Sequence, residues 1–142
     1  MSNALDLSFE DISVGRTVSF EIVITAQMVE SFAALSGDQN PLHMDEVYAA
    51  ATDFHERVVH GMLGASFFSQ LVGMHLPGKR ALYLSQSLMF RAPITIGMNL
   101  VVSGEVFQKV ESAQVLTLRT LVLEKDTGRN LIEGEAVVKV LH

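Results

Sequence analysis

The feature that most constrains the fold of this chain is the segment 61–74, which is apolar on nearly every face of a helix. Its apolar members include Met62, Leu63, Ala65, Phe67, Phe68, Leu71 and Val72. A helix that is hydrophobic all round has to be covered on all sides, so this one belongs in a core. The stretch is too short to span a bilayer, and we expect no membrane insertion. The rest of the chain must therefore wrap around it.

The wrapping surface is indicated by period-two patterns on both sides of this helix. A first strand is predicted at 16–25, and four more at 82–90, 99–108, 114–124 and 131–141. The last four can pair as an antiparallel meander. A curved five-stranded sheet around one long buried helix, an α+β fold, hides the apolar surfaces of both elements.

The segment between the first strand and the apolar helix has clear start and stop signals. Residues 26–36 have helical spacing, and Gly37 follows where a left-handed C-terminal residue would lie. Pro41 keeps the residue before it out of the α region, so residues 38–43 are predicted to form an ordered loop rather than more helix. Asp45 is predicted to cap a short helix after it.

Size and charge limit the class of protein. With 142 residues the chain fits a single domain, residues 1–142, and its net charge of −6 has no basic stripe for a nucleic acid. The absence of cysteine excludes disulfides and thiolate catalysis. The N-terminal residues lack the basic start and apolar run of a signal peptide, so we expect a cytoplasmic protein.

The residue types that could perform chemistry gather in the predicted loop. Asp38 and His43 offer two titrating groups with different reference pKa values, although their spacing alone favours a purely structural role in the turn. Asn40 can orient a neighbour or brace the loop backbone. The amide of Gly61, at the start of the apolar helix, would point with the helix dipole at an anionic group, or glycine simply eases the chain into the helix there.

Several other kinds of site have no support in the sequence. The five histidines include no His-x-x-x-His helix pair, so we expect no metal site. No nucleophile elbow, phosphate-binding loop or dinucleotide fingerprint is present, and we expect no cofactor.

Four segments carry a resemblance to a known family. The run Phe32-Ala-Ala-Leu-Ser-Gly-Asp-Gln-Asn-Pro-Leu-His43 resembles the hydratase 2 motif of the MaoC-like hydratases, as does Val59-His-Gly-Met-Leu63. The runs Leu84-Ser-Gln-Ser-Leu-Met-Phe90 and Gly134-Glu-Ala-Val-Val-Lys139 extend the similarity over nearly the whole chain. Within this family, the sequence resembles the short, single-domain R-specific enoyl-CoA hydratases.

The resemblance implies a fold, a reaction and a site. The implied fold is the hot-dog fold, and members of the family usually assemble as homodimers with active sites at the subunit interface. The reaction is reversible addition of water to a trans-2-enoyl-CoA of fatty acid metabolism, giving the (R)-3-hydroxyacyl-CoA without metal or redox cofactor. The catalytic pair falls on Asp38 and His43 and the thioester-polarising amide on Gly61. Ser69 and Val72 are implied as the wall beside the acyl chain.

Three alternatives stay open from the sequence. A (3R)-hydroxyacyl-acyl-carrier-protein dehydratase would use the same chemistry on a different carrier. A thioesterase of the same fold would add water to the carbonyl carbon instead. A non-catalytic acyl-CoA binding module would use the loop containing Asp38 and His43 only as structure.

Overall fold

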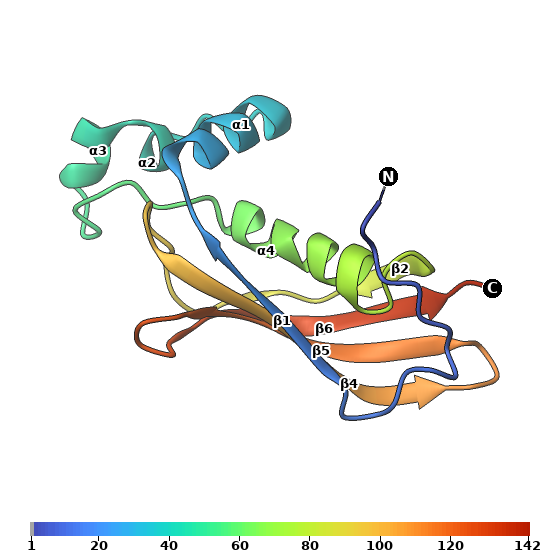
Figure 1. The fold of residues 1–142 in the computed structure, drawn as a ribbon. Coiled ribbons are helices and arrows are strands. Elements are labelled where there is room, and N and C mark those ends of the chain that lie inside the picture. Colours follow the sequence, from blue (N-terminus) through green and yellow to red (C-terminus); the bar gives the residue numbers. More distant parts are fainter. Residues whose placement is uncertain (1) are drawn as a thin grey trace.

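The computed structural model describes residues 2–142, in which one antiparallel sheet curves beneath a long helix (Figure 1). The spatial order of the strands is β1-β4-β5-β6-β2, and β3 also pairs with β6. The strands are β1 (Thr17–Val23), β2 (Ala81–Gln86), β3 (Met89–Phe90), β4 (Asn99–Val110), β5 (Val115–Glu124) and β6 (Asn130–Val140). The predicted α+β hot-dog architecture is confirmed.

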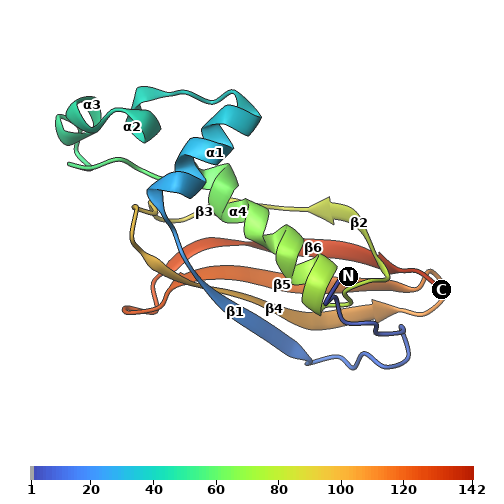
Figure 2. The same ribbon diagram turned by 45° about the horizontal axis from the view of Figure 1, so that its top comes forward.

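The helix α4 (Gly61–Gln70) lies along one face of this sheet and continues into a π-helical turn, η1 (Leu71–His75) (Figures 1 and 2). Phe68 and Leu71 are 1% and 0% exposed in a core with the inward-facing residues of the sheet. The prediction of a buried helix at 61–74 is therefore confirmed. One face of this helix stays uncovered in the single chain, as the 57% exposure of Met62 shows.

The predicted meander is wrong for its first strand. The predicted strand 82–90 is interrupted and forms β2 and β3, which both pair with β6 rather than with the strand that follows them in the sequence. The interruption lies at Ser87, where Gln86 Nε2 donates to the Ser87 carbonyl and Glu135 N donates to the Ser87 hydroxyl. Only β4, β5 and β6 form a meander among the described residues.

The cause of this topology is the crossover formed by residues 91–98, which carries the chain from β3, beside β6, to β4, beside the edge strand β1. It passes the start of α4, where Val59 N donates to Ile94 O and Gly97 N donates to Ile24 O. Ile94 and Ile132 press so closely on Gly64 that a Cβ there would lie 2.8 Å from each side chain. The crossover therefore places β4 beside β1 and covers the N-terminal end of α4.

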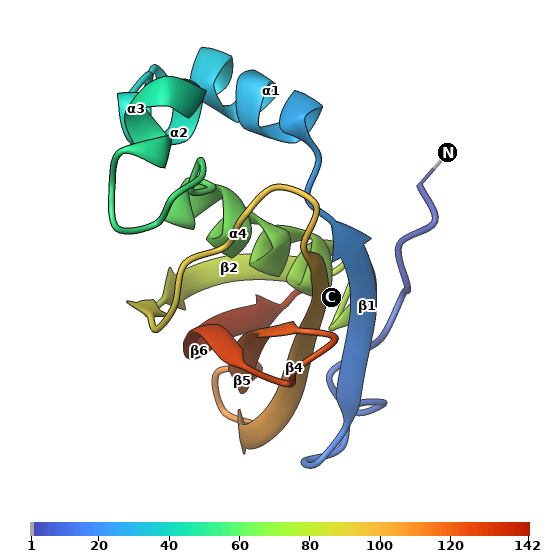
Figure 3. The same ribbon diagram turned by 90° about the vertical axis from the view of Figure 1, so that its left-hand side faces the viewer.

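Three further helices form a layer on the other side of α4 from the sheet (Figures 1 and 3). They are α1 (Ala26–Ser36), α2 (Pro41–Met44) and α3 (Glu46–Ala50). The predicted loop 38–43 is wrong in its second half, because Pro41, whose fixed φ suits the first helical position, starts a helix that contains His43. The predicted cap is confirmed: the Asp45 side chain accepts from Tyr48 N at 3.0 Å.

Among residues 2–142, no helix has both the length and the apolar character needed to cross a bilayer.

Candidate functional site

Asp38 is presented by a tight turn at the end of α1. Gly37 adopts the left-handed conformation with a φ of 79°, which turns the chain out of the helix and favours glycine. The turn is then fixed by two hydrogen bonds, from Asp38 N to Ser36 Oγ and from Asn40 N to Asp38 Oδ1, each 3.1 Å long. These bonds leave Oδ2 of Asp38, whose side chain is 48% exposed, available to other partners.

His43 is held by both its backbone and its ring. Asn40 caps α2 by accepting from Leu42 N at 2.9 Å. Nδ1 of His43 lies 2.6 Å from the carbonyl oxygen of Val58. A carbonyl oxygen can only accept, so Nδ1 carries the proton in this contact. In the neutral ring Nε2 therefore presents its lone pair.

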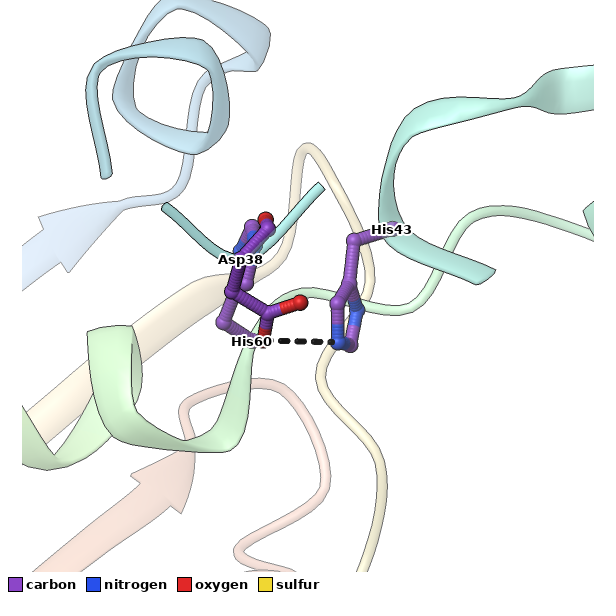
Figure 4. A group of neighbouring side chains, drawn as sticks. All are labelled: Asp38, His43 and His60. Atoms are coloured by element: carbon purple, nitrogen blue, oxygen red, sulfur yellow. Dashed lines mark hydrogen bonds and ion pairs between the residues drawn. The ribbon is translucent and has the colours of Figure 1, made fainter. Parts of the chain in front are cut away.

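The two side chains face each other, with Nε2 of His43 3.8 Å from Oδ2 of Asp38 (Figure 4). Both atoms are acceptors when the imidazole is neutral and the carboxylate is ionised. Such a pair can bind one water that donates to both, or can share a proton. The structural role foreseen for Asp38 is also present, since it closes its own turn. The two roles use different carboxylate oxygens.

His60, which the sequence did not single out for chemistry, joins this pair. It is 2% exposed, its Nε2 lies 3.0 Å from the Asp38 carbonyl oxygen, and its ring centroid is 4.1 Å from that of His43 (Figure 4). His60 is 22 residues from Asp38 in sequence. No local spacing could have revealed the contact, which depends on how α4 meets the helical layer.

Asp38, His43 and His60 each offer a potential metal-ligand atom, and these three atoms lie within 4.8 Å of one another. The rings of the two histidines are tilted by only 31° at a separation of 4.1 Å. Nitrogen lone pairs lie in the ring planes, so two rings stacked in this way direct them side by side rather than toward one point. The arrangement suits acid–base chemistry better than shared coordination.

Gly61 is brought into the same cleft as His43. As the first residue of α4 it has no side-chain cap before it, and no acceptor in residues 2–142 pairs with its amide. The cleft has a volume of about 310 Å³, and its other lining residues come from the segment before α4, the strand β3, the crossover and β6, but not from Asp38. A Cβ at Gly61 would lie 2.9 Å from the Phe90 ring, so glycine keeps the approach to the amide open. The free amide and the helix dipole favour an anionic oxygen there.

The remaining predicted residues are distributed elsewhere. Asn40 is exposed and serves as the α2 cap. Ser69 is exposed on α4, whereas Val72 is 1% exposed in the core cluster that also contains Leu76. Neither Ser69 nor Val72 lines the cleft that contains His43 and Gly61. Their assignment to an acyl-chain wall stays a prediction.

A larger cavity of about 630 Å³ lies next to α3 and contains none of the predicted site residues. It is lined by Ala26, Glu46, Val47, Ala50, His55, Glu56, Arg57 and Ile96.

Comparison with known proteins decides the family. A sequence model of the MaoC-like domain matches residues 10–139. The chain belongs to the MaoC-like family. An (R)-specific enoyl-CoA hydratase from Aeromonas caviae is 42% identical over 134 residues, which cover 94% of this chain and 99% of the relative. A mitochondrial 3-hydroxyacyl-acyl-carrier-protein dehydratase from Arabidopsis thaliana is 32% identical over 88% of this chain and 75% of its own length.

Solved structures of MaoC-like relatives share the same fold. An R-hydratase from Pseudomonas aeruginosa in the unliganded form superposes with a TM-score of 0.93 at 33% identity, covering 98% of this chain and 88% of that one. The (R)-hydratase from A. caviae superposes with a TM-score of 0.89, covering 92% of this chain and 98% of that one. These relatives are hydratases and dehydratases, which are hydro-lyases.

Proposed function

We propose that this MaoC-like protein is an R-specific enoyl-CoA hydratase, which reversibly converts a trans-2-enoyl-CoA into the (R)-3-hydroxyacyl-CoA. The observation that carries the proposal is the bare Nε2 of His43, which faces Asp38 Oδ2 at 3.8 Å and shares a cleft with the free Gly61 amide. The identity of 42% to a curated (R)-specific enoyl-CoA hydratase over most of the chain supports the same reaction.

The Gly61 amide is proposed to activate the thioester. When the thioester carbonyl oxygen accepts from this amide, electron density is drawn from the conjugated double bond and C3 becomes electrophilic. Negative charge then develops on the same oxygen as water adds, and the amide and the positive end of the α4 dipole stabilise it. Loss of one such donor costs on the order of 10²- to 10³-fold in rate.

Asp38 and His43 are proposed to handle the protons. A water that donates to both acceptors is activated when one of them takes its proton, and its oxygen forms the new bond to C3. The electron pair of the double bond moves through C2 to the carbonyl oxygen. C2 then receives a proton from the pair, so one H and one OH are added in total. Which of the two groups takes the first proton is left open in this proposal.

The decisive experiment follows loss of the enoyl-thioester absorbance of crotonyl-CoA. Asp38→Asn and His43→Gln are each expected to lower the rate by on the order of 10²-fold or more while far-UV circular dichroism stays unchanged. Near-wild-type rates in both variants would overturn the assignment. Chiral analysis of the product tests the R outcome, and release of free CoA, followed with a thiol reagent, would point to a thioesterase instead.

A dehydratase acting on an acyl carrier protein is the second candidate, favoured by the Arabidopsis relative named above. Both activities would use Asp38, His43 and Gly61 identically. Parallel assays with CoA and carrier-protein thioesters of one chain length separate them.

A non-catalytic binding module would bind both thioesters without turning over either, and its affinity would not change in Asp38→Asn.

We further propose that the protein acts as a homodimer through the free edge of the sheet. β2 lies at this edge, and Leu82, Leu84 and Phe90 on β2 and β3 are 47%, 52% and 49% exposed. An open strand edge lined by apolar side chains favours pairing with a second copy. Sedimentation velocity is expected to show a dimer that Leu84→Lys weakens, and a monomer in the wild type would contradict the proposal.

Two further proposals concern the whole chain. Residues 1–142 are proposed to act as one domain, which the domain match over residues 10–139 supports. Limited proteolysis should then leave one resistant core.

A cytoplasmic location is proposed because a chain without cysteine is compatible with a reducing compartment. Cell fractionation tests it.

A further inference from the structure

His60 is a buried polar residue that the proposed chemistry leaves without a role. It is the N-cap residue of α4, directly before Gly61, and its ring is enclosed by aromatic neighbours. The ring centroid of Phe32 lies 4.9 Å away in an edge-on arrangement, and that of His43 lies 4.1 Å away, nearly stacked. A histidine that is 2% exposed loses its hydration, and its contacts with the protein have to offset that cost.

The hydrogen bonds of His60 define its protonation. Nε2 lies 3.0 Å from the Asp38 carbonyl oxygen, which can only accept, so Nε2 carries a proton. Nδ1 is buried and has no partner among the described residues. A second proton on Nδ1 would therefore create a buried charge with an unpaired donor, which is strongly unfavourable. The ring is accordingly neutral, with its proton on Nε2.

This neutral ring connects the three parts of the proposed site. Its Nε2–H holds the peptide of Asp38, its face backs the ring of His43, and its own backbone leads directly into Gly61. The other hydrogen bonds that fix the turn of Asp38 are local, from Asp38 N to Ser36 and from Asn40 N to Asp38, whereas the helix of His43 is also held by Val58. The His60 bond is what ties the acid–base turn to the helix that presents the thioester-polarising amide.

We propose that His60 is a positioning residue, which keeps Asp38 Oδ2 and His43 Nε2 aligned with each other and with the Gly61 amide without exchanging a proton itself. The inference rests on the proposed function, because its kinetic consequence is read in thioester hydration. A displacement of about 1 Å in a catalytic group can cost on the order of 10²-fold in rate. A single tether that prevents such a displacement is therefore measurable.

A matched pair of variants tests the tether. In His60→Gln the side-chain amide nitrogen takes the position of Nε2 and can still donate to the Asp38 carbonyl, whereas in His60→Asn it takes the position of Nδ1 and cannot. We expect the glutamine variant to stay near the wild-type kcat. The asparagine variant is expected to lose on the order of 10²-fold in kcat with little change in KM.

Two controls separate positioning from folding. In an Asp38→Asn background, His60→Asn is expected to cause little further loss, because both changes act on one unit. Thermal unfolding of the two His60 variants shows whether they differ in stability. Equal kcat losses in His60→Gln and His60→Asn, or full activity in His60→Asn, would overturn the proposal.

A measurement on the wild-type protein is independent of activity. Long-range ¹H–¹⁵N correlation spectra of the imidazole rings are expected to show His60 neutral at pH 7 with its proton on Nε2, and His43 with a proton on Nδ1. A proton on Nδ1 of His60 overturns the proposal even if the enzyme is active. If no thioester is hydrated, the proposed function fails, and these spectra alone decide whether the His60 tether exists.

Discussion

The two ring nitrogens of His43 have different surroundings: Nδ1 is hydrogen-bonded to the Val58 carbonyl oxygen at 2.6 Å, while Nε2 faces Asp38 Oδ2 at 3.8 Å. A direct hydrogen bond would be shorter, at about 2.7–3.2 Å. The gap suits a water that lies to one side and donates to both atoms. Because the Val58 contact fixes the tautomer of the neutral ring, both atoms are acceptors, as the proposed proton transfer requires.

The cap of α2 is expected to control activity as well as stability. Asn40→Ala removes the acceptor for Leu42 N and should cost about 1 kcal/mol of unfolding free energy. It also frees the start of the helix that carries His43, so kcat should fall. Asp45→Ala removes the equivalent cap of α3 and serves as the control. Urea unfolding should show similar losses in the two variants, and an equal loss of kcat in Asp45→Ala would contradict this role for Asn40.

Two glycines at the start of α4 should respond differently to the same substitution. In Gly61→Ala the new methyl meets the ring of Phe90, which is 49% exposed and free to move, so stability should change little while the narrowed cleft lowers kcat/KM. In Gly64→Ala the methyl meets Ile94 and Ile132, which are buried, and overpacking should cost about 1–3 kcal/mol. Denaturant unfolding and steady-state kinetics distinguish the two outcomes.

Much of the fold could be predicted because periodicity reports burial directly. The all-round apolar character of 61–74 predicted the central helix, and alternation predicted the strands. The pairing of β2 with β6 was missed because local patterns do not define which strands become neighbours. That choice depends on the crossover 91–98, whose path along α4 is determined by tertiary packing.

The candidate site was predictable only as far as its local parts. Asp38, His43 and Gly61 each stand beside a recognisable turn or helix start, and the resemblance to MaoC-like hydratases assigned them roles. The contact of His60 with Asp38 joins segments 22 residues apart and leaves no signal in either one. The resemblance implies Ser69 and Val72 as one wall, yet one is exposed and the other buried, because a spacing of three only partly aligns two side chains on a helix.

A half-buried phenol is expected to make stability depend on alkaline pH. Burial raises the pKa of Tyr83 to about 12, and its hydroxyl donates to Gln86 Oε1. The unfolded chain loses this proton near the ordinary pKa of about 10, so the contribution to stability is complete below that pH and is lost as pH rises toward about 12. The unfolding free energy should fall more steeply over this range in the wild type than in Tyr83→Phe. Parallel curves in urea titrations would contradict the assignment.

Arg57 is expected to hold α2 against the segment that leads into α4. The Arg57 side chain is only 10% exposed, and its Nε donates to the His43 carbonyl oxygen at 2.5 Å. Its second contact is weaker, because the distance to Glu30 is 3.5 Å and the Glu30 side chain is 55% exposed. Arg57→Met should therefore cost about 1.5–3 kcal/mol, the usual range for a hydrogen bond to a charged group, and should lower kcat because the backbone of His43 is released. Glu30→Gln should change either quantity little, since exposed ion pairs contribute about 0–1 kcal/mol. Chemical denaturation and crotonyl-CoA kinetics on both variants provide the comparison. A larger loss of stability and kcat in Glu30→Gln than in Arg57→Met would show that the ion pair, rather than the carbonyl contact, holds the helix.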